Sequence, residues 1–113
     1  MNRKAPIKIH RGSDNIFADL GFPDAETHLL KAQLVNRLQQ AIDGQDLTQS
    51  AAARVMGVSQ PDVSRMLRGQ FRDISVERIM RMLNKLGCEI DISIKARGKK
   101  ARFAPIHLDA APA

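Results

Sequence analysis

The sequence predicts an all-α domain that carries one β-strand near its C-terminal end. Two patterns lead to this fold class. Four stretches show helical spacing of apolar residues between a capping residue and a glycine, and one later stretch alternates apolar and polar residues. The chain has 113 residues, of which 43% are hydrophobic, so it can form one small core. Trp and Tyr are absent and only 4 Phe are present, which favours aliphatic packing between helices.

A Ser, Thr or Asp precedes each helical stretch, and a glycine follows it. The side chains of these first residues accept a hydrogen bond from the first helical turn, and glycine adopts the left-handed conformation after the last turn without strain. The expected helices are residues 25–43 between Asp24 and Gly44, 49–56 between Thr48 and Gly57, 60–68 between Ser59 and Gly69, and 76–86 between Ser75 and Gly87.

The alternating stretch is CEIDISIK, residues 88–95. Side chains of a strand point alternately to its two faces, so this pattern predicts a half-buried strand. A lone strand leaves its backbone groups unpaired and needs a partner. The segment Ile7–His10 is the weaker candidate. We expect the same strand of a second subunit to pair with it antiparallel, which places Ile90, Ile92 and Ile94 at a homodimer interface.

The charge predicts three segments and a polyanionic partner. The formal net charge is +6. The excess of basic over acidic residues lies at the two ends, in residues 1–13 and 95–113. The expected segments are an N-terminal extension, residues 1–23, a domain at residues 24–95, and a flexible tail, residues 96–113. These tails are either merely solvated or add phosphate contacts. The apolar stretch at residues 15–22 either packs over the domain or docks a protein partner. No run approaches the ~20 apolar residues of a membrane span, so nucleic acid is favoured over a membrane.

The sequence favours a binding protein over an enzyme. His10, His28 and His107 lack metal-ligand spacing, and the single Cys88 excludes a zinc pattern. No nucleophile–base arrangement or phosphate-binding glycine loop is present. We therefore expect no metal, no cofactor and no catalytic residue. A single cysteine and the lack of a signal-peptide pattern fit the cytoplasm.

The second and third expected helices are joined by a short turn that contains glycine, as in a helix-turn-helix. With Gln49 as the first position, the fifth is Ala53, where the helices cross closely. The ninth is Gly57, where the turn needs a positive φ. The fifteenth and eighteenth, Val63 and Met66, are apolar and can pack back onto the domain.

The stretch Leu47–Gln70, LTQSAAARVMGVSQPDVSRMLRGQ, resembles the phage-repressor-like (Cro-type, XRE) helix-turn-helix. The wider stretch Ser13–Lys95 is similar to the antitoxin subfamily that is paired with RelE/HigB-type toxins. The resemblance implies a lambda-repressor-like bundle, a homodimer, operator DNA as ligand, and a toxin as a second protein partner. The residues after Lys95 do not match the family pattern. A solitary regulator without a toxin, and an antitoxin that acts mainly by binding a ribonuclease, remain open.

In a helix-turn-helix, the third expected helix places its N-terminal part in the major groove. Gln60 stands at its first position and can bridge two groups of an adenine edge, while Arg65 can reach guanine or a phosphate. The family uses a glutamine at the position of Gln49 to grip phosphate. The alternative is that these are ordinary polar surface residues. The candidate DNA-binding residues are Gln49, Ser59, Gln60, Ser64, Arg65, Arg68 and Arg72.

Pro61 and Asp62 fit the first turn of this helix. No intrahelical N–H bond is lost at Pro61, and its ring sets a helical φ. Asp62 is expected to complete a capping box with Ser59, with its charge at the positive end of the helix dipole.

Overall fold

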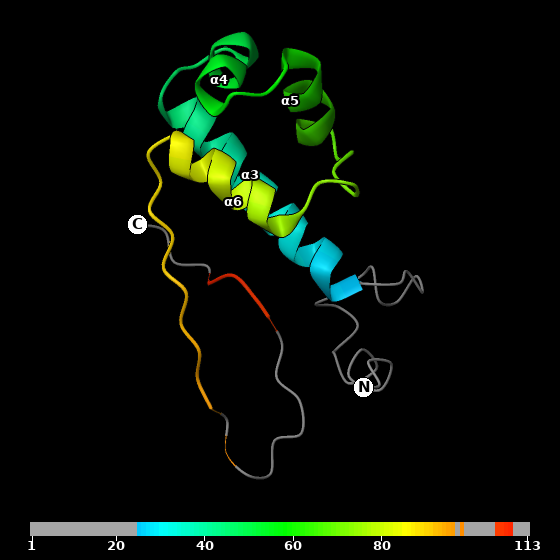
Figure 1. Ribbon diagram of the computed structural model, residues 1–113, viewed down its shortest axis with the longest axis vertical. Coiled ribbons are helices and arrows are strands. Elements are labelled where there is room, and N and C mark those ends of the chain that lie inside the picture. The colour runs from blue at the N-terminus through cyan, green and yellow to red at the C-terminus, as the bar shows by residue number, and fades with distance from the viewer. Residues whose placement is uncertain (1–24, 97, 99–105, 110–113) are drawn as a thin grey trace. The chain divides into compact units, whose positions relative to one another are not determined.

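The structure is a computed structural model that describes residues 25–96, 98 and 106–109. Its helices are α3 (Ala25–Gly44), α4 (Gln49–Met56), α5 (Gln60–Leu67) and α6 (Val76–Lys85), coloured from cyan to yellow in Figure 1. The described residues thus contain four helices and no strand. The predicted helical architecture is confirmed, and every observed helix end lies within one residue of its expected position.

The chain divides into two units, one of residues Lys31–Asp91 and one of residues Met1–Leu30 with Ile92–Ala113. The unit Lys31–Asp91 contains most of α3 and all of α4, α5 and α6. Within it, the C-terminal ends of α3 and α6 lie together, because Gln45 Nε2 donates a hydrogen bond of 2.7 Å to the Leu86 carbonyl. In the other unit, the Ile106 N–H donates to Glu26 Oε2 at 2.8 Å.

The core of the unit Lys31–Asp91 is aliphatic, as the composition predicts. All four helices contribute large aliphatic side chains to this core. Burying one such side chain stabilises the fold by about 2 kcal/mol relative to leaving it exposed. Helix α4 also buries Ala52 and Ala53, whose small side chains let its backbone pack close to α5 and α6. The large, fully buried side chains are Leu38, Ile42, Met56, Val63, Met66 and Ile79.

Three of the four predicted N-terminal caps are present. The hydroxyl oxygens of Thr48, Ser59 and Ser75 accept hydrogen bonds of 3.0 to 3.2 Å from the backbone N–H three residues later. Each cap residue is extended, so its side chain can turn back over the first helical turn. The fourth predicted cap, Asp24, lies outside the described residues.

The C-terminal ends of α4, α5 and α6 share one backbone motif, in which a glycine of positive φ is followed by an N–H that reaches the last turn. These bonds run from Val58 to Ala53, from Gln70 to Arg65 and from Cys88 to Leu83. Helix α3 ends differently. The prediction that Gly44 follows this helix is wrong, because Gly44 belongs to α3 and Asp46 takes the positive φ of 55°. Aspartate tolerates that conformation.

The predicted strand at residues 88–95 is also not found. The described chain is extended there but forms no ladder, and the side chains of Ile92 and Ile94 are 74% and 92% exposed. The physical reason is that strand geometry requires a second strand, and the described residues of one chain offer none. The weaker partner candidate, Ile7–His10, lies outside the described residues. Pairing of this segment between two chains stays a proposal, which the exposure of the two isoleucines motivates.

Candidate nucleic-acid interface

The turn between α4 and α5 has the geometry of a helix-turn-helix. Gly57 adopts a φ of 74°, and a Cβ built on it would lie 3.4 Å from Lys85 Nζ. That ammonium donates a hydrogen bond of 3.4 Å to the Met56 carbonyl, so α6 helps to hold the turn. The small fifth residue, Ala53, is 3% exposed. The turn therefore meets the demands that the residue spacing predicts.

Helix α5 buries one face against the core and leaves its other faces exposed to solvent. Val63 and Met66 are buried, which fixes the rotation of the helix on the core. Gln60, Arg65 and Arg68 are exposed, and Ser64 is half-buried. Figure 1 shows α4 and α5 joined by the short turn, with the start of α5 directly after it. The polar candidates on α5 are thus available to a ligand outside the domain.

The structure brings Gln49 and Gln60 together. They are the first residues of α4 and α5, and Gln60 Nε2 donates a hydrogen bond of 3.3 Å to Gln49 Oε1. Both side chains are exposed. One bond of this kind leaves Gln60 with its amide oxygen and a second N–H, and leaves Gln49 with its whole amide nitrogen. The remaining groups match an adenine edge and a phosphate oxygen.

The other polar side chains of α5 are paired along the helix. Arg65 Nη2 forms an ion pair with Asp62 Oδ1, and the two side chains are 50% and 45% exposed. Arg68 Nη1 donates a hydrogen bond of 3.0 Å to Ser64 Oγ. Half of the expected capping box is observed, because Ser59 Oγ accepts from the Asp62 N–H. The carboxylate of Asp62, by contrast, is engaged with Arg65 one turn later.

The loop after α5 is tied to α3. Lys31 Nζ donates a hydrogen bond of 2.8 Å to the carbonyl of Arg72, which fixes the loop backbone that carries this exposed candidate. No sequence pattern indicates this contact, because the two residues are 41 positions apart and Lys31 lies in an ordinary polar position of α3.

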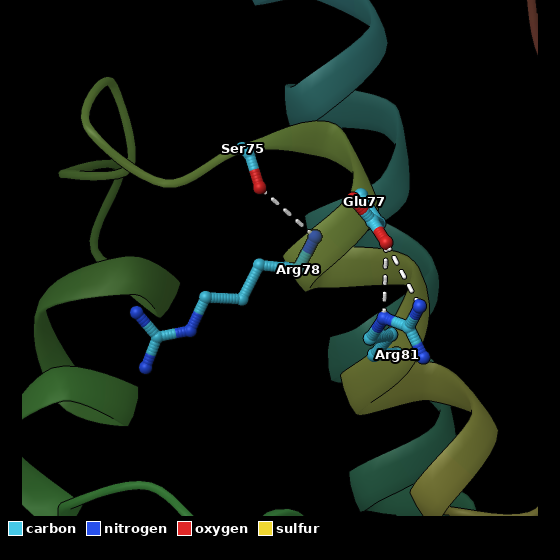
Figure 2. A network of polar contacts seen from close by, with 4 residues as sticks. All are labelled: Ser75, Glu77, Arg78 and Arg81. Carbon is cyan, nitrogen blue, oxygen red and sulfur yellow. Dashed lines mark hydrogen bonds and ion pairs between the residues drawn. The ribbon is translucent and has the colours of Figure 1, made fainter.

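Arg78 is a further candidate residue, which the sequence pattern does not indicate. At the start of α6, Glu77 Oε2 pairs with Arg81 Nη2 at 2.8 Å, whereas the side chain of Arg78 extends the other way, toward the ribbon of α5 (Figure 2). Its backbone N–H donates to Ser75 Oγ, but within the described part of the chain its guanidinium forms no hydrogen bond. Arg78 is exposed and available to an anion. No pattern among the neighbouring residues of the sequence indicates that the side chain of Arg78 extends toward α5.

Residues 25–96, 98 and 106–109 contain no group of three or more His, Cys, Asp or Glu side chains that could hold a metal ion. Among these same residues, no helix has the length and apolar character that crossing a membrane requires.

Residues 16–95 match the model of a family described as "Helix-turn-helix domain". A solved structure that bears the name of an XRE-family transcriptional regulator is 37% identical to this chain, with a TM-score of 0.72. The match covers 79% of this chain and 100% of that one. No curated protein matches.

The fold and the turn define a helix-turn-helix protein. The family match spans more than half of the chain, so the chain belongs to this helix-turn-helix family, and its likeness to the solved relative makes it one of XRE type.

Proposed function

We propose that the protein is a sequence-specific DNA-binding transcriptional repressor that reads double-stranded operator DNA with α5. The observation that carries the proposal is the pairing of Gln60 with Gln49 at the N-terminal ends of α5 and α4. A helix-turn-helix of this kind presents the first turn of its second helix to base edges. The name of the solved relative, an XRE-family transcriptional regulator, supports the same proposed function.

In this proposal each side chain has a distinct role. Gln60 bridges the N6 and N7 groups of an adenine, and Arg65 donates to a guanine. Gln49 and Ser59 contact phosphates at the rim of the groove, with Ser64, Arg68 and Arg72 on the flanks of α5 and in the following loop. We add Arg78 to the phosphate contacts, because its guanidinium is exposed and extends on the α5 side of α6 (Figure 2).

A homodimer is part of the proposal. Ile92 and Ile94 are exposed on an extended segment, and two such segments from two chains can pair antiparallel and cover each other's apolar side chains. A two-fold dimer places two recognition helices about 34 Å apart, in successive major grooves of a pseudo-palindromic site. Occupying a promoter in this way blocks transcription. The proposed location is the cytoplasm, where the operator is accessible.

The finer part of the proposal is an antitoxin role, in which the protein also binds a RelE/HigB-type toxin and represses its own promoter. It rests on the resemblance of residues 13–95 to that subfamily. Co-expression of a His-tagged version with the product of the adjacent reading frame tests it. Co-purification of a small basic protein whose ribonuclease activity is suppressed supports the antitoxin. Separate elution of the two products supports the alternative, a solitary regulator without a toxin.

Selection of binding sites from a random-sequence duplex library tests the DNA-binding proposal itself. We expect the wild-type protein to enrich two inverted half-sites whose centres are one helical turn, about 10 base pairs, apart. Gln40→Ala, which changes an exposed glutamine of α3, should enrich the same sites, whereas Gln60→Ala should lose the preference at one position of each half-site. Enrichment of no sequence by the wild type would contradict the proposal.

A further inference from the structure

The charge of Asp62, the acidic residue on α5, contributes little to stability: it lies in the first turn at the positive end of the helix dipole, which adds at most about 1 kcal/mol at an exposed position. Asp62 is the third residue of the helix, and its backbone N–H is already satisfied by Ser59 Oγ. Its carboxylate pairs with Arg65, but both side chains are about half exposed, and exposed ion pairs of this spacing add little to stability. A negative charge in the half of α5 that faces DNA also repels phosphates. Its position on the recognition helix therefore calls for another explanation.

The ion pair fixes the direction of the arginine. An unrestrained Arg65 side chain has many rotamers and can reach a backbone phosphate as easily as a base. The carboxylate of Asp62 lies one turn closer to the N-terminus of α5, so the pair draws the guanidinium of Arg65 back toward the end of the helix that enters the groove. One N–H group of the guanidinium binds Asp62, and four remain for a ligand.

We propose that Asp62 is a specificity-determining residue that acts through Arg65. It holds the guanidinium toward a guanine edge and away from phosphate, so that the contact of Arg65 carries sequence information. This inference rests on the proposed DNA-binding function and deepens it. Asp62 lowers affinity for DNA in general, because it brings a negative charge close to the phosphates, and raises the ratio of specific to non-specific binding.

The chain offers a matched control on α6. Glu77 pairs with Arg81 in the same manner, and its side chain is likewise exposed. Figure 2 shows this pair on the side of α6 opposite to the Arg78 side chain. Asp62→Asn and Glu77→Gln remove one negative charge each and keep the size of the side chain. They differ in which arginine loses its ion-pair partner: Arg65 in Asp62→Asn, and Arg81 in Glu77→Gln.

The test compares selected sites and binding for the wild type, Asp62→Asn, Glu77→Gln, Arg65→Ala and the double variant Asp62→Asn/Arg65→Ala. All variants are first checked for the wild-type circular dichroism spectrum. Each is then titrated by fluorescence anisotropy with the duplex that the wild type enriches and with a scrambled duplex of the same composition. We expect Asp62→Asn to bind the scrambled duplex more tightly and to lose at least about fivefold of the preference, the lower end of what one arginine–guanine contact provides.

Because Asp62 acts through Arg65, the double variant should show the same preference as Arg65→Ala alone, and Glu77→Gln should show the wild-type preference. An unchanged preference in Asp62→Asn overturns the inference while the DNA-binding proposal stands. An additive loss in the double variant also overturns it, since Asp62 would then act independently. If the wild type prefers no duplex, the proposed function fails and this inference fails with it.

Discussion

Gln60 Nε2 donates a hydrogen bond of 3.3 Å to Gln49 Oε1, so the first residues of α5 and α4 touch across the turn that joins the two helices. The contact orients the one side chain that stands at the very start of the proposed recognition helix. It also joins a proposed base-reading residue to a proposed phosphate-binding residue, which makes each dependent on the other.

Gln49→Ala should therefore weaken binding although Gln49 reads no base. The change removes the bond that orients Gln60 and one phosphate contact, and we expect affinity for the preferred duplex to fall roughly three- to tenfold, the range of one such hydrogen bond. Anisotropy titration measures the loss. Ser50→Ala, at the neighbouring exposed position of α4, should bind like the wild type. Wild-type affinity of Gln49→Ala would show that the contact has no role in binding.

Gly57→Ala should destabilise the fold. The turn holds Gly57 at a φ of 74°, where an alanine costs about 1–2 kcal/mol, and the added Cβ would lie 3.4 Å from Lys85 Nζ. Urea unfolding followed by circular dichroism measures the change in the free energy of unfolding. Gly44→Ala is the matched control. Gly44 is helical, and a Cβ there meets nothing within 4 Å, so we expect no loss and a gain of up to ~1 kcal/mol. Equal stability of both variants would contradict the account of the turn.

Arg78→Ala and Arg81→Ala remove the same charge from neighbouring turns of α6, but only Arg78 extends toward α5 (Figure 2). If Arg78 binds a phosphate, its loss should make the negative slope of log K against log salt concentration shallower by about 0.9, at every DNA sequence alike. Arg81 is paired with Glu77, and its loss should leave the slope at the wild-type value. Anisotropy titrations at several salt concentrations decide between the two outcomes; identical slopes for the two variants would remove Arg78 from the interface.

Ile92→Lys should convert the proposed dimer into a monomer, because it places a charge where two extended segments would cover each other's apolar side chains. Light scattering measures the molar mass. Ser93→Lys adds the same charge to the next, alternate position of the segment and should leave the dimer intact, since successive side chains of a strand point to opposite faces. A dimeric Ile92→Lys protein would rule out pairing through this segment.

The sequence predicts what depends on neighbours along the chain. The caps Thr48, Ser59 and Ser75 act over three residues, and the turn glycine Gly57 acts over five, so the helices and their junction were predictable. Asp46 shows the limit of this local reasoning, because both a glycine and an aspartate near one helix end can take the left-handed conformation.

Contacts between distant or competing groups were not predictable. The Lys31–Arg72 bond spans 41 residues, and nothing in either residue's surroundings in the sequence indicates it. Asp62 had two partners within reach, the Ser59 backbone and Arg65, and the structure shows the ion pair with Arg65. The strand at residues 88–95 was predicted from alternation alone, whereas a strand also depends on a second segment that the described residues of one chain do not supply.

The central claim is that α5 reads bases through Gln60 and Arg65. The most direct test is an anisotropy titration of the double variant Gln60→Ala/Arg65→Ala with the duplex that the wild type enriches and with a scrambled duplex of the same composition. We expect the variant to bind both duplexes with equal, weak and salt-sensitive affinity, because the phosphate contacts remain while base reading is lost. A variant that keeps the wild-type preference for the enriched duplex would contradict the claim.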